Sequence, residues 1–231
     1  MDVLIQVEHL SKSYGRKKAL DKINLTLSSG KIVGLLGPNG SGKTTFIKIL
    51  NGLLRNYKGD VFIDKQPIGR HSKEIISYFP DEPYFEGWMS VSYVLQLFDD
   101  MYADFDKEKA LALLEQMHIQ KKDKIKNMSK GMIEKLELIL VMSRRAKIYL
   151  LDEPIGHVDP IARQEILDLI IHNYDEEALI LMTTHLISDI ESIFDEVIFI
   201  KDGSILLHEN CEDLRIKEQA SILEIFKEKL K

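Results

Sequence analysis

Residues 37–45 read Gly-Pro-Asn-Gly-Ser-Gly-Lys-Thr-Thr, and the rest of the sequence is best interpreted outward from them. They satisfy the phosphate-binding pattern G-x-x-x-x-G-K-[ST]. An apolar run typical of a buried strand, Ile32–Leu36, precedes the loop, and a predicted helix at about Thr44–Leu50 follows it. This order of strand, loop and helix predicts a nucleotide site on an α/β core. We expect nucleotide contacts from all of its residues: Gly37, Pro38, Asn39, Gly40, Ser41, Gly42, Lys43, Thr44 and Thr45.

The residue types of this loop suit a triphosphate. Glycines let the backbone curl so that successive N–H groups point at phosphate oxygens. The following helix adds the positive end of its dipole. Lys43 neutralises the β- and γ-phosphates, and the Thr44 hydroxyl is a ligand for Mg²⁺. The predicted ligands are therefore ATP and Mg²⁺, and GTP is disfavoured because the chain lacks an N/T-K-x-D motif.

A pair of carboxylates follows the next buried strand. Asp152 and Glu153 come directly after the apolar run Ile148–Leu151. Ligands bind at the carboxyl ends of strands in open α/β sheets, so we expect both side chains beside the phosphates. Asp152 would hold the magnesium, and Glu153 would polarise the attacking water as general base. His185, at the end of another strand, would bind the γ-phosphate and align that water. Together these residues predict hydrolysis as well as binding.

Composition limits the other possibilities. The chain has 231 residues, 45% of them hydrophobic and 29% charged, as expected of one globular domain. Its net charge of -6, with no long block of one sign, argues against nucleic acid as the main partner. A single cysteine, Cys211, excludes an internal disulfide. No run approaches the roughly 18–20 apolar residues that span a bilayer, and the N-terminus lacks signal-peptide features. We expect a cytoplasmic protein that reaches a membrane only through a partner.

Periodicity divides the chain into an α/β core and a helical insertion. Residues 84–145 show helical spacing alone, with helices expected at 91–101, 107–117 and 129–144. The α/β alternation continues on both sides of this block. Strands are expected at 3–7, 21–27, 61–63, 75–79, 179–182, 197–200 and 204–207. The last two flank the hairpin signal Asp202-Gly203. Helices are expected after Asp159-Pro160, through Phe194, and along a tail at 212–231 that would pack on its own domain.

On these motifs the chain resembles the ABC ATPase family over nearly its whole length. Tyr14 matches the aromatic residue that stacks on adenine, and residues 128–132, Met-Ser-Lys-Gly-Met, look like the LSGGQ signature. Ser129 and Gly131 are retained, and Lys130 adds positive charge at a helix N-terminus. The resemblance implies a P-loop NTPase core with an antiparallel β subdomain and an inserted α-helical subdomain. It also implies a head-to-tail dimer, homo- or heteromeric, in which the signature of one ATPase subunit faces the γ-phosphate held by the other.

Within the signature, Lys130 stands where the family has its first glycine and Met132 where it has glutamine, and two further positions depart from the family pattern. Asp81 stands in the loop at 79–83 where the family usually carries a magnesium-sensing glutamine. A carboxylate can bind the metal or its water, so we expect Asp81, Thr44 and Asp152 as metal ligands. Residues 155–159 match the loop that crosses the dimer interface. They keep Asp159, a nucleotide contact by resemblance, but place His157 where a small residue is usual.

The resemblance implies the ATP-hydrolysing subunit of an ABC transporter at the cytoplasmic face of the cell membrane. Phe85, Trp88 and Met89 would then line the groove for a membrane subunit, although a simple core cluster explains them equally well. The Ser-Lys-Gly-Met variant is similar to that of small bacterial exporters of drugs, peptides or lipid-like molecules. A soluble ABC ATPase of translation, repair or cluster assembly is the alternative, disfavoured by the single ATPase unit and the absence of long heptad repeats. A regulator that barely turns over is disfavoured by Glu153 and His185.

Overall fold

The core is a mostly parallel sheet of six strands in the part of the chain that the computed structural model describes, residues 2–156 and 158–230. The central strands are buried along their whole length, which explains their continuous apolar runs. β3 pairs in parallel with β8 and β9, β8 with β7, and β7 with β6, while β10 runs antiparallel to β9. The spatial order is β10 (Ser204–Asn210), β9 (Glu196–Lys201), β3 (Lys31–Leu36), β8 (Leu179–Thr184), β7 (Ile148–Asp152) and β6 (Ile76–Phe79).

A smaller antiparallel sheet packs against this core through helix α1 (Lys43–Leu50). Phe46 and Ile47 of α1 are buried in one cluster with Ile5 of the small sheet and Leu35 of the large one. The small sheet therefore fixes where α1 begins, and with it the loop that precedes this helix. Its strands, in spatial order, are β2 (Lys17–Ser28), β1 (Val3–Tyr14), β4 (Lys58–Ile63) and β5 (Gln66–Pro67).

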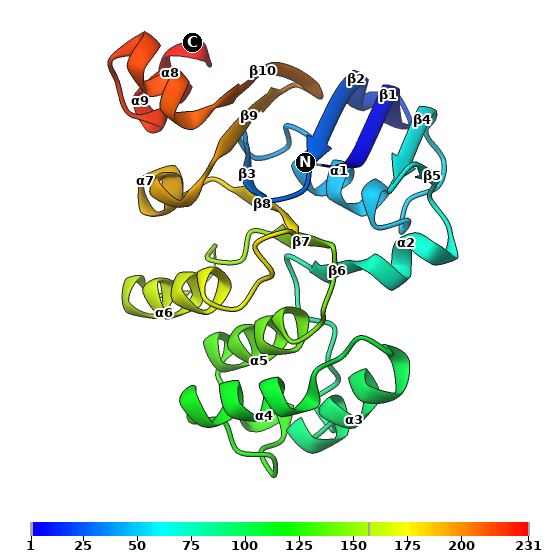
Figure 1. The fold of residues 1–231 in the computed structure, drawn as a ribbon, viewed down its shortest axis with the longest axis vertical. Helices are drawn as coiled ribbons and strands as arrows, with labels where there is room; N and C mark the ends of the chain where they lie inside the picture. Colours follow the sequence, from blue (N-terminus) through cyan, green and yellow to red (C-terminus); the bar gives the residue numbers. More distant parts are fainter. Residues whose placement is uncertain (1, 157, 231) are drawn as a thin grey trace.

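The expected helical segment holds α3 (Val91–Met101), α4 (Lys107–Gln116), α5 (Lys130–Met142) and a 3₁₀ turn, Ile125–Asn127. Figure 1 shows these helices at the end of the molecule opposite the small sheet. Buried Arg144 joins them to the core. Its guanidinium donates to the carbonyl oxygens of Ile76 at 2.5 Å and Glu74 at 2.9 Å, and to Asp104 at 3.0 Å.

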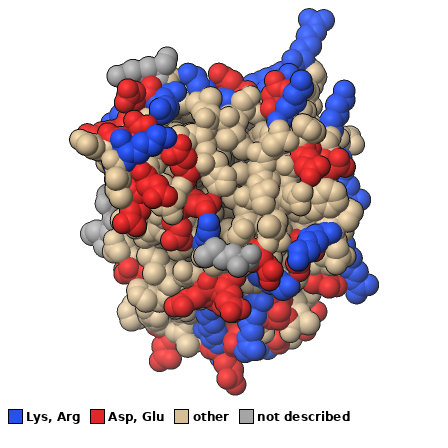
Figure 2. Space-filling model, turned by 45° about the horizontal axis from the view of Figure 1, so that its top comes forward, with Lys and Arg blue, Asp and Glu red and all other residues tan. Residues whose placement is uncertain are grey.

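The remaining helices surround the large sheet. None of the helices in the described residues is both long and apolar enough to cross a membrane. On the face shown in Figure 2, Lys and Arg are interspersed with Asp and Glu. The helices outside the helical segment, apart from α1, are α2 (Arg70–Ile75), α6 (Pro160–Ile171), α7 (Ile187–Ile190), the 3₁₀ turn Glu191–Ile193, α8 (Cys211–Glu218) and α9 (Ile222–Lys229).

Two expected elements differ in type from the sequence interpretation. Ile75, expected in a strand, ends helix α2. The helix expected through Phe194 stops at Ile190 and gives way to a 3₁₀ turn. The Phe194 ring packs on β3, because a Cβ on Gly34 would lie only 2.7 Å from it. The helix therefore ends before Phe194, because this ring packs on β3 and the chain then continues into β9.

The C-terminal tail is two helices and not one. Gln219 adopts a left-handed backbone conformation, φ 51°, that ends α8. Ser221 and Glu224 then form a capping box that starts α9. The expected packing on the chain's own domain is confirmed, because the Phe226 ring meets Phe199 of β9 edge-to-face at 5.2 Å between centroids.

Candidate active site

The phosphate loop leads into the N-terminus of α1, and close packing requires glycine at two of its positions. Gly42 precedes the helix with φ 112°, in the left-handed region that favours glycine. A Cβ there would lie 2.5 Å from the Ala19 carbonyl oxygen, and a Cβ on Gly37 would lie 2.4 Å from that of Ile200. The loop is thus held between β2 and β9.

A cavity of about 430 Å³ opens over this loop. It brings together residues that the sequence analysis selected from distant segments, and its volume suits a small-molecule ligand. Gly37 and Pro38 are not among its lining residues, but their carbonyl oxygens accept from the Lys43 ammonium at 2.8 and 3.4 Å. The lining residues are Tyr14, Lys17, Ala19, Asn39, Gly40, Ser41, Gly42, Lys43, Thr44, Thr45, Asp81, Glu153 and His185.

Glu153 lies at the centre of the charged groups in this cavity. Its Oε1 is 3.4 Å from the Lys43 ammonium, and its Oε2 is 2.8 Å from Nδ1 of His185. The His185 backbone N–H also donates to Oε2, at 3.2 Å. Glu153 has φ 53°, a left-handed conformation that costs a non-glycine residue on the order of 1–3 kcal/mol. The surrounding contacts maintain this strain, which turns the carboxylate toward the phosphate loop.

Asp152 is buried beneath the loop. Its Oδ1 accepts hydrogen bonds from the hydroxyls of Thr183 at 2.6 Å and Thr44 at 3.3 Å. Oδ2 has no hydrogen-bond partner in residues 2–156 and 158–230. The pKa of Asp152 is raised overall, and burial is the largest cause. The two hydroxyl hydrogen bonds oppose this shift by lowering the pKa, whereas the charges of Asp81 and Glu153 raise it further.

These oxygen donors fit a magnesium ion. Mg²⁺ is held by carboxylates, hydroxyls and water, and a buried carboxylate oxygen without a hydrogen-bond partner is a suitable ligand. Asp81 lines the same cavity, close enough for its charge to raise the pKa of Asp152. Asp152 itself is fully buried and does not line the cavity, but it bonds to Thr44, which does.

Tyr14 lies at the other end, at the last position of β1. Half of its surface is exposed, and the Lys12 ammonium lies 5.1 Å from its ring centroid. Lys12 is itself fixed by a 2.5 Å hydrogen bond to the Asn56 carbonyl oxygen. The ring is thus supported on one side by a cation, and it contributes to the cavity wall.

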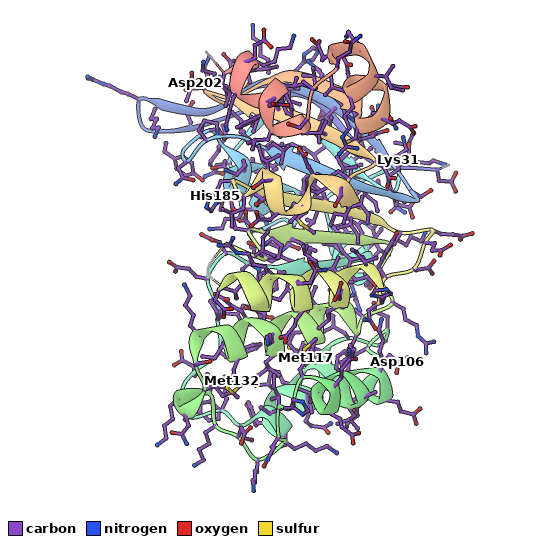
Figure 3. All side chains as sticks on the ribbon, turned by 90° about the vertical axis from the view of Figure 1, so that its left-hand side faces the viewer. Lys31, Asp106, Met117, Met132, His185 and Asp202 are labelled. Atoms are coloured by element: carbon purple, nitrogen blue, oxygen red, sulfur yellow. The ribbon has the colours of Figure 1, made fainter. Side chains whose placement is uncertain are left out.

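The signature residues lie elsewhere. The Ser129 hydroxyl caps α5 by accepting from the Met132 N–H at 3.3 Å, and Lys130 lies 3.8 Å from Glu134. Figure 3 shows His185 and Met132 on the same side of the molecule but well separated along its long axis. Ser129, Lys130, Gly131 and Asp159 are all absent from the residues that line the described cavity.

The loop at residues 155–159, which the resemblance predicts at a dimer interface, is described only in part. His157 lies outside the described residues. Asp159 is exposed and directly precedes α6, and its carbonyl oxygen accepts from the Arg163 N–H at 3.1 Å, as expected at a helix start. One chain therefore places the phosphate loop, the acid pair and His185 together, and leaves the signature and Asp159 apart from them.

Sequence reasoning missed Thr183 and Lys17. Thr183 donates to Asp152 and accepts from the Glu153 N–H at 2.9 Å, so one hydroxyl orients both acids. The sequence held no signal for Thr183, because its role follows from pairing with Asp152 on the neighbouring strand β7. Lys17 lines the cavity beside Tyr14. Its signal was the short turn that pairs these two residues across the β1–β2 hairpin.

The fold and this site define an ATP-binding protein of the α/β class. The family model described as "ABC transporter" matches residues 20–156, more than half of the chain. The chain therefore belongs to the ABC transporter family, as an ATPase of that family.

Curated relatives and a solved structure agree with this assignment. The lantibiotic transport ATP-binding protein SrtF of Streptococcus pyogenes is 30% identical over 219 residues, covering 91% of this chain and 95% of the relative. The lipopolysaccharide export system ATP-binding protein LptB of Escherichia coli K12 is 30% identical over 215 residues, covering 88% and 89%. A solved ATP-binding subunit of an ABC transporter has the same fold, with a TM-score of 0.89, 24% identity, and coverage of 99% and 100%.

Proposed function

We propose that this chain hydrolyses ATP in a site shared with a second ATPase subunit, and that the resulting motion drives export through separate membrane subunits. The observation that carries the proposal is the Glu153 carboxylate, held between Lys43 and His185 at the mouth of the phosphate loop. Family membership supplies the ATPase class. The assignment of individual residues rests on their geometry.

The residues that the sequence analysis selected around the phosphate loop each have a task in this proposal. The backbone of Gly37–Thr45 and the Lys43 ammonium bind the phosphates, and Tyr14 stacks on adenine. Thr44, Asp152 and Asp81 hold magnesium, which when bound neutralises phosphate charge. Glu153 accepts a proton from the attacking water as general base, and His185 fixes the orientation of Glu153.

A second chain completes the site. Among the described residues a Cβ on Gly131 would meet only Val158, at 4.0 Å, so no contact with them requires glycine there. A phosphate approaching the helix N-terminus would require it. We assign Ser129, Lys130, Gly131 and Asp159 to contacts with the nucleotide of the opposite subunit in a head-to-tail dimer.

The partner in the membrane would dock on the helical segment, which we propose spans residues 84–145 of one ABC ATPase domain. Trp88 is 61% exposed and lies 5.1 Å from the Tyr93 ring, whereas Phe85 and Met89 pack against the core. The two explanations of this cluster therefore apply to different residues: Phe85 and Met89 anchor the loop, and Trp88 is available to a membrane subunit. This docking would place the chain at the cytoplasmic face of the membrane.

Export of a peptide or lipid-like molecule is the proposed direction and substrate class. It is supported by the Ser-Lys-Gly-Met signature and by the names of the two relatives, one for lantibiotic transport and one for lipopolysaccharide export.

Purification from native membranes tests the transporter role. We expect the chain to copurify with an integral membrane protein and its ATPase activity to require magnesium. Trp88→Ala should release the chain from that partner and leave ATP hydrolysis by the isolated chain unchanged. Recovery with ribosomes or DNA in place of a membrane protein would contradict the transporter role.

A further inference from the structure

A second cation lies beside Tyr14 at the rim of the cavity. The antiparallel pairing of β1 with β2 sets Tyr14 directly opposite Lys17. Residues directly opposite one another in an antiparallel pair project from the same face, so both side chains face the cavity, and both line it.

The strand places Lys17 at the Tyr14 end of the site and runs from there toward the phosphate loop. Ala19, two residues further on, also lines the cavity, and its carbonyl oxygen packs against Gly42 at the start of α1. At about 3.4 Å per residue, Lys17 lies roughly 7 Å along the strand from Ala19, toward Tyr14. A nucleotide with its base on Tyr14 and its terminal phosphates at Lys43 would place its ribose and α-phosphate beside Lys17.

Among the described residues Lys17 has no competing partner, in contrast to Lys43, Lys12 and Lys18. Lys43 interacts with Glu153 and two carbonyl oxygens, and Lys12 with the Asn56 carbonyl oxygen and the Tyr14 ring. Lys18 pairs with Asp21 at 2.8 Å. Within residues 2–156 and 158–230, the Lys17 ammonium makes no ion pair or hydrogen bond, and the side chain is exposed.

We propose that Lys17 is a nucleotide-binding residue whose ammonium contacts the α-phosphate, and this inference rests on the proposed ATP site. The local charges favour such a contact. Asp81 and Glu153 add negative charge to the cavity, and Lys43 is already paired with one of them. A further cation on the adenine side offsets repulsion of the incoming triphosphate without contacting the reacting γ-phosphate.

Equilibrium binding of ATP, AMP and adenosine to the full-length protein tests the proposal, measured by titration calorimetry. Lys17→Ala should weaken ATP and AMP binding about five- to tenfold, as expected for loss of one partly solvated charged hydrogen bond to phosphate. Adenosine binding should stay the same because adenosine carries no phosphate. Lys17→Arg should retain most of the affinity for ATP.

Lys18→Ala is the matched control. It removes the same charge from the next residue of the strand, whose side chain projects to the other face and pairs with Asp21. Equal losses of ATP affinity for Lys17→Ala and Lys18→Ala would overturn the proposal, and so would an equal loss of affinity for ATP and adenosine. If the unaltered chain bound no ATP, the nucleotide site itself would be refuted. If instead the unaltered chain and Lys17→Ala bound ATP equally well, only the proposed contact of Lys17 would be refuted.

Discussion

The two segments that we propose bind anions, Gly37–Thr45 and Ser129–Gly131, are built in different ways. In the first, Cβ atoms on Gly37 and Gly42 would collide with backbone of the same chain, and Lys43 is paired with Glu153. In the second, a Cβ on Gly131 would meet only Val158, at 4.0 Å, among the described residues, and Ser129 caps its own helix. The first segment is explained by contacts within the chain. Contacts among the described residues do not explain the second, and this is why the proposal assigns it to a nucleotide held by another chain.

The largest expected effect concerns Glu153, which belongs to the first segment's site. Glu153→Gln should lower ATP turnover by a factor of about 10²–10⁴, because it removes the proposed base and leaves the shape unchanged. ATP should still dimerise the protein. Phosphate release and size-exclusion chromatography measure the two effects, with exposed Glu228→Gln of α9 as control. Turnover at the unaltered rate would show that Glu153 is not the base.

Mixing two inactive variants tests whether Ser129–Gly131 of one chain acts on the nucleotide bound by Gly37–Thr45 of another. Lys43→Ala should abolish ATP binding. Gly131→Asp should keep ATP binding by the isolated chain within about twofold and lower turnover about 10–100-fold, because it places a carboxylate where an anion must bind. A mixed dimer has one site in which both segments are intact, so combining the variants should restore activity. Absence of restored activity would argue against a composite site between two copies of this chain.

The phosphate loop could be predicted because its chemistry is local. Gly42, Lys43 and Thr44 act through backbone shape and charge within one turn, so their order in the sequence suffices. Thr183 could not be predicted, because its role depends on which strand lies beside β7. The same holds for Phe194, which leaves helical structure to pack its ring on a glycine of a distant strand.

The helical segment also differs from the core in carrying a buried acid outside the proposed site. Glu137 of α5 is fully buried, and in the described residues neither carboxylate oxygen has a hydrogen-bond partner. Burial, followed by the charge of Glu134, raises the pKa of Glu137 from 4.5 to about 8. The folded state therefore binds a proton more tightly than the unfolded state does. The contribution of protonated Glu137 to the stability of the folded protein is present below pH 4.5 and is lost as the pH rises toward 8.

Glu137→Gln should remove this pH dependence. Between pH 5 and 8.5 the variant should lose less stability than the unaltered chain. The expected difference at the upper end is about 2 kcal/mol, or ~4–8 °C in Tm for a chain of this size. Thermal unfolding followed by circular dichroism across this range measures it, with Glu228→Gln again as control. Parallel Tm curves for the unaltered chain and Glu137→Gln would show that Glu137 is ionised in the folded protein.

The smallest expected effect is at Lys130, where the signature departs from its usual glycine. Its ammonium is exposed and lies 3.8 Å from Glu134, so part of its charge is already compensated within the chain. Lys130→Gly should therefore lower turnover by only about two- to fivefold, as expected for one charge near a helix N-terminus. The difference should shrink as salt is raised from 50 to 500 mM, because salt screens an exposed charge. A loss above tenfold that persisted in high salt would mean that Lys130 contacts phosphate directly. The second segment would then bind the anion through a side chain, as the first does through Lys43, and would not rely on its backbone and helix dipole alone.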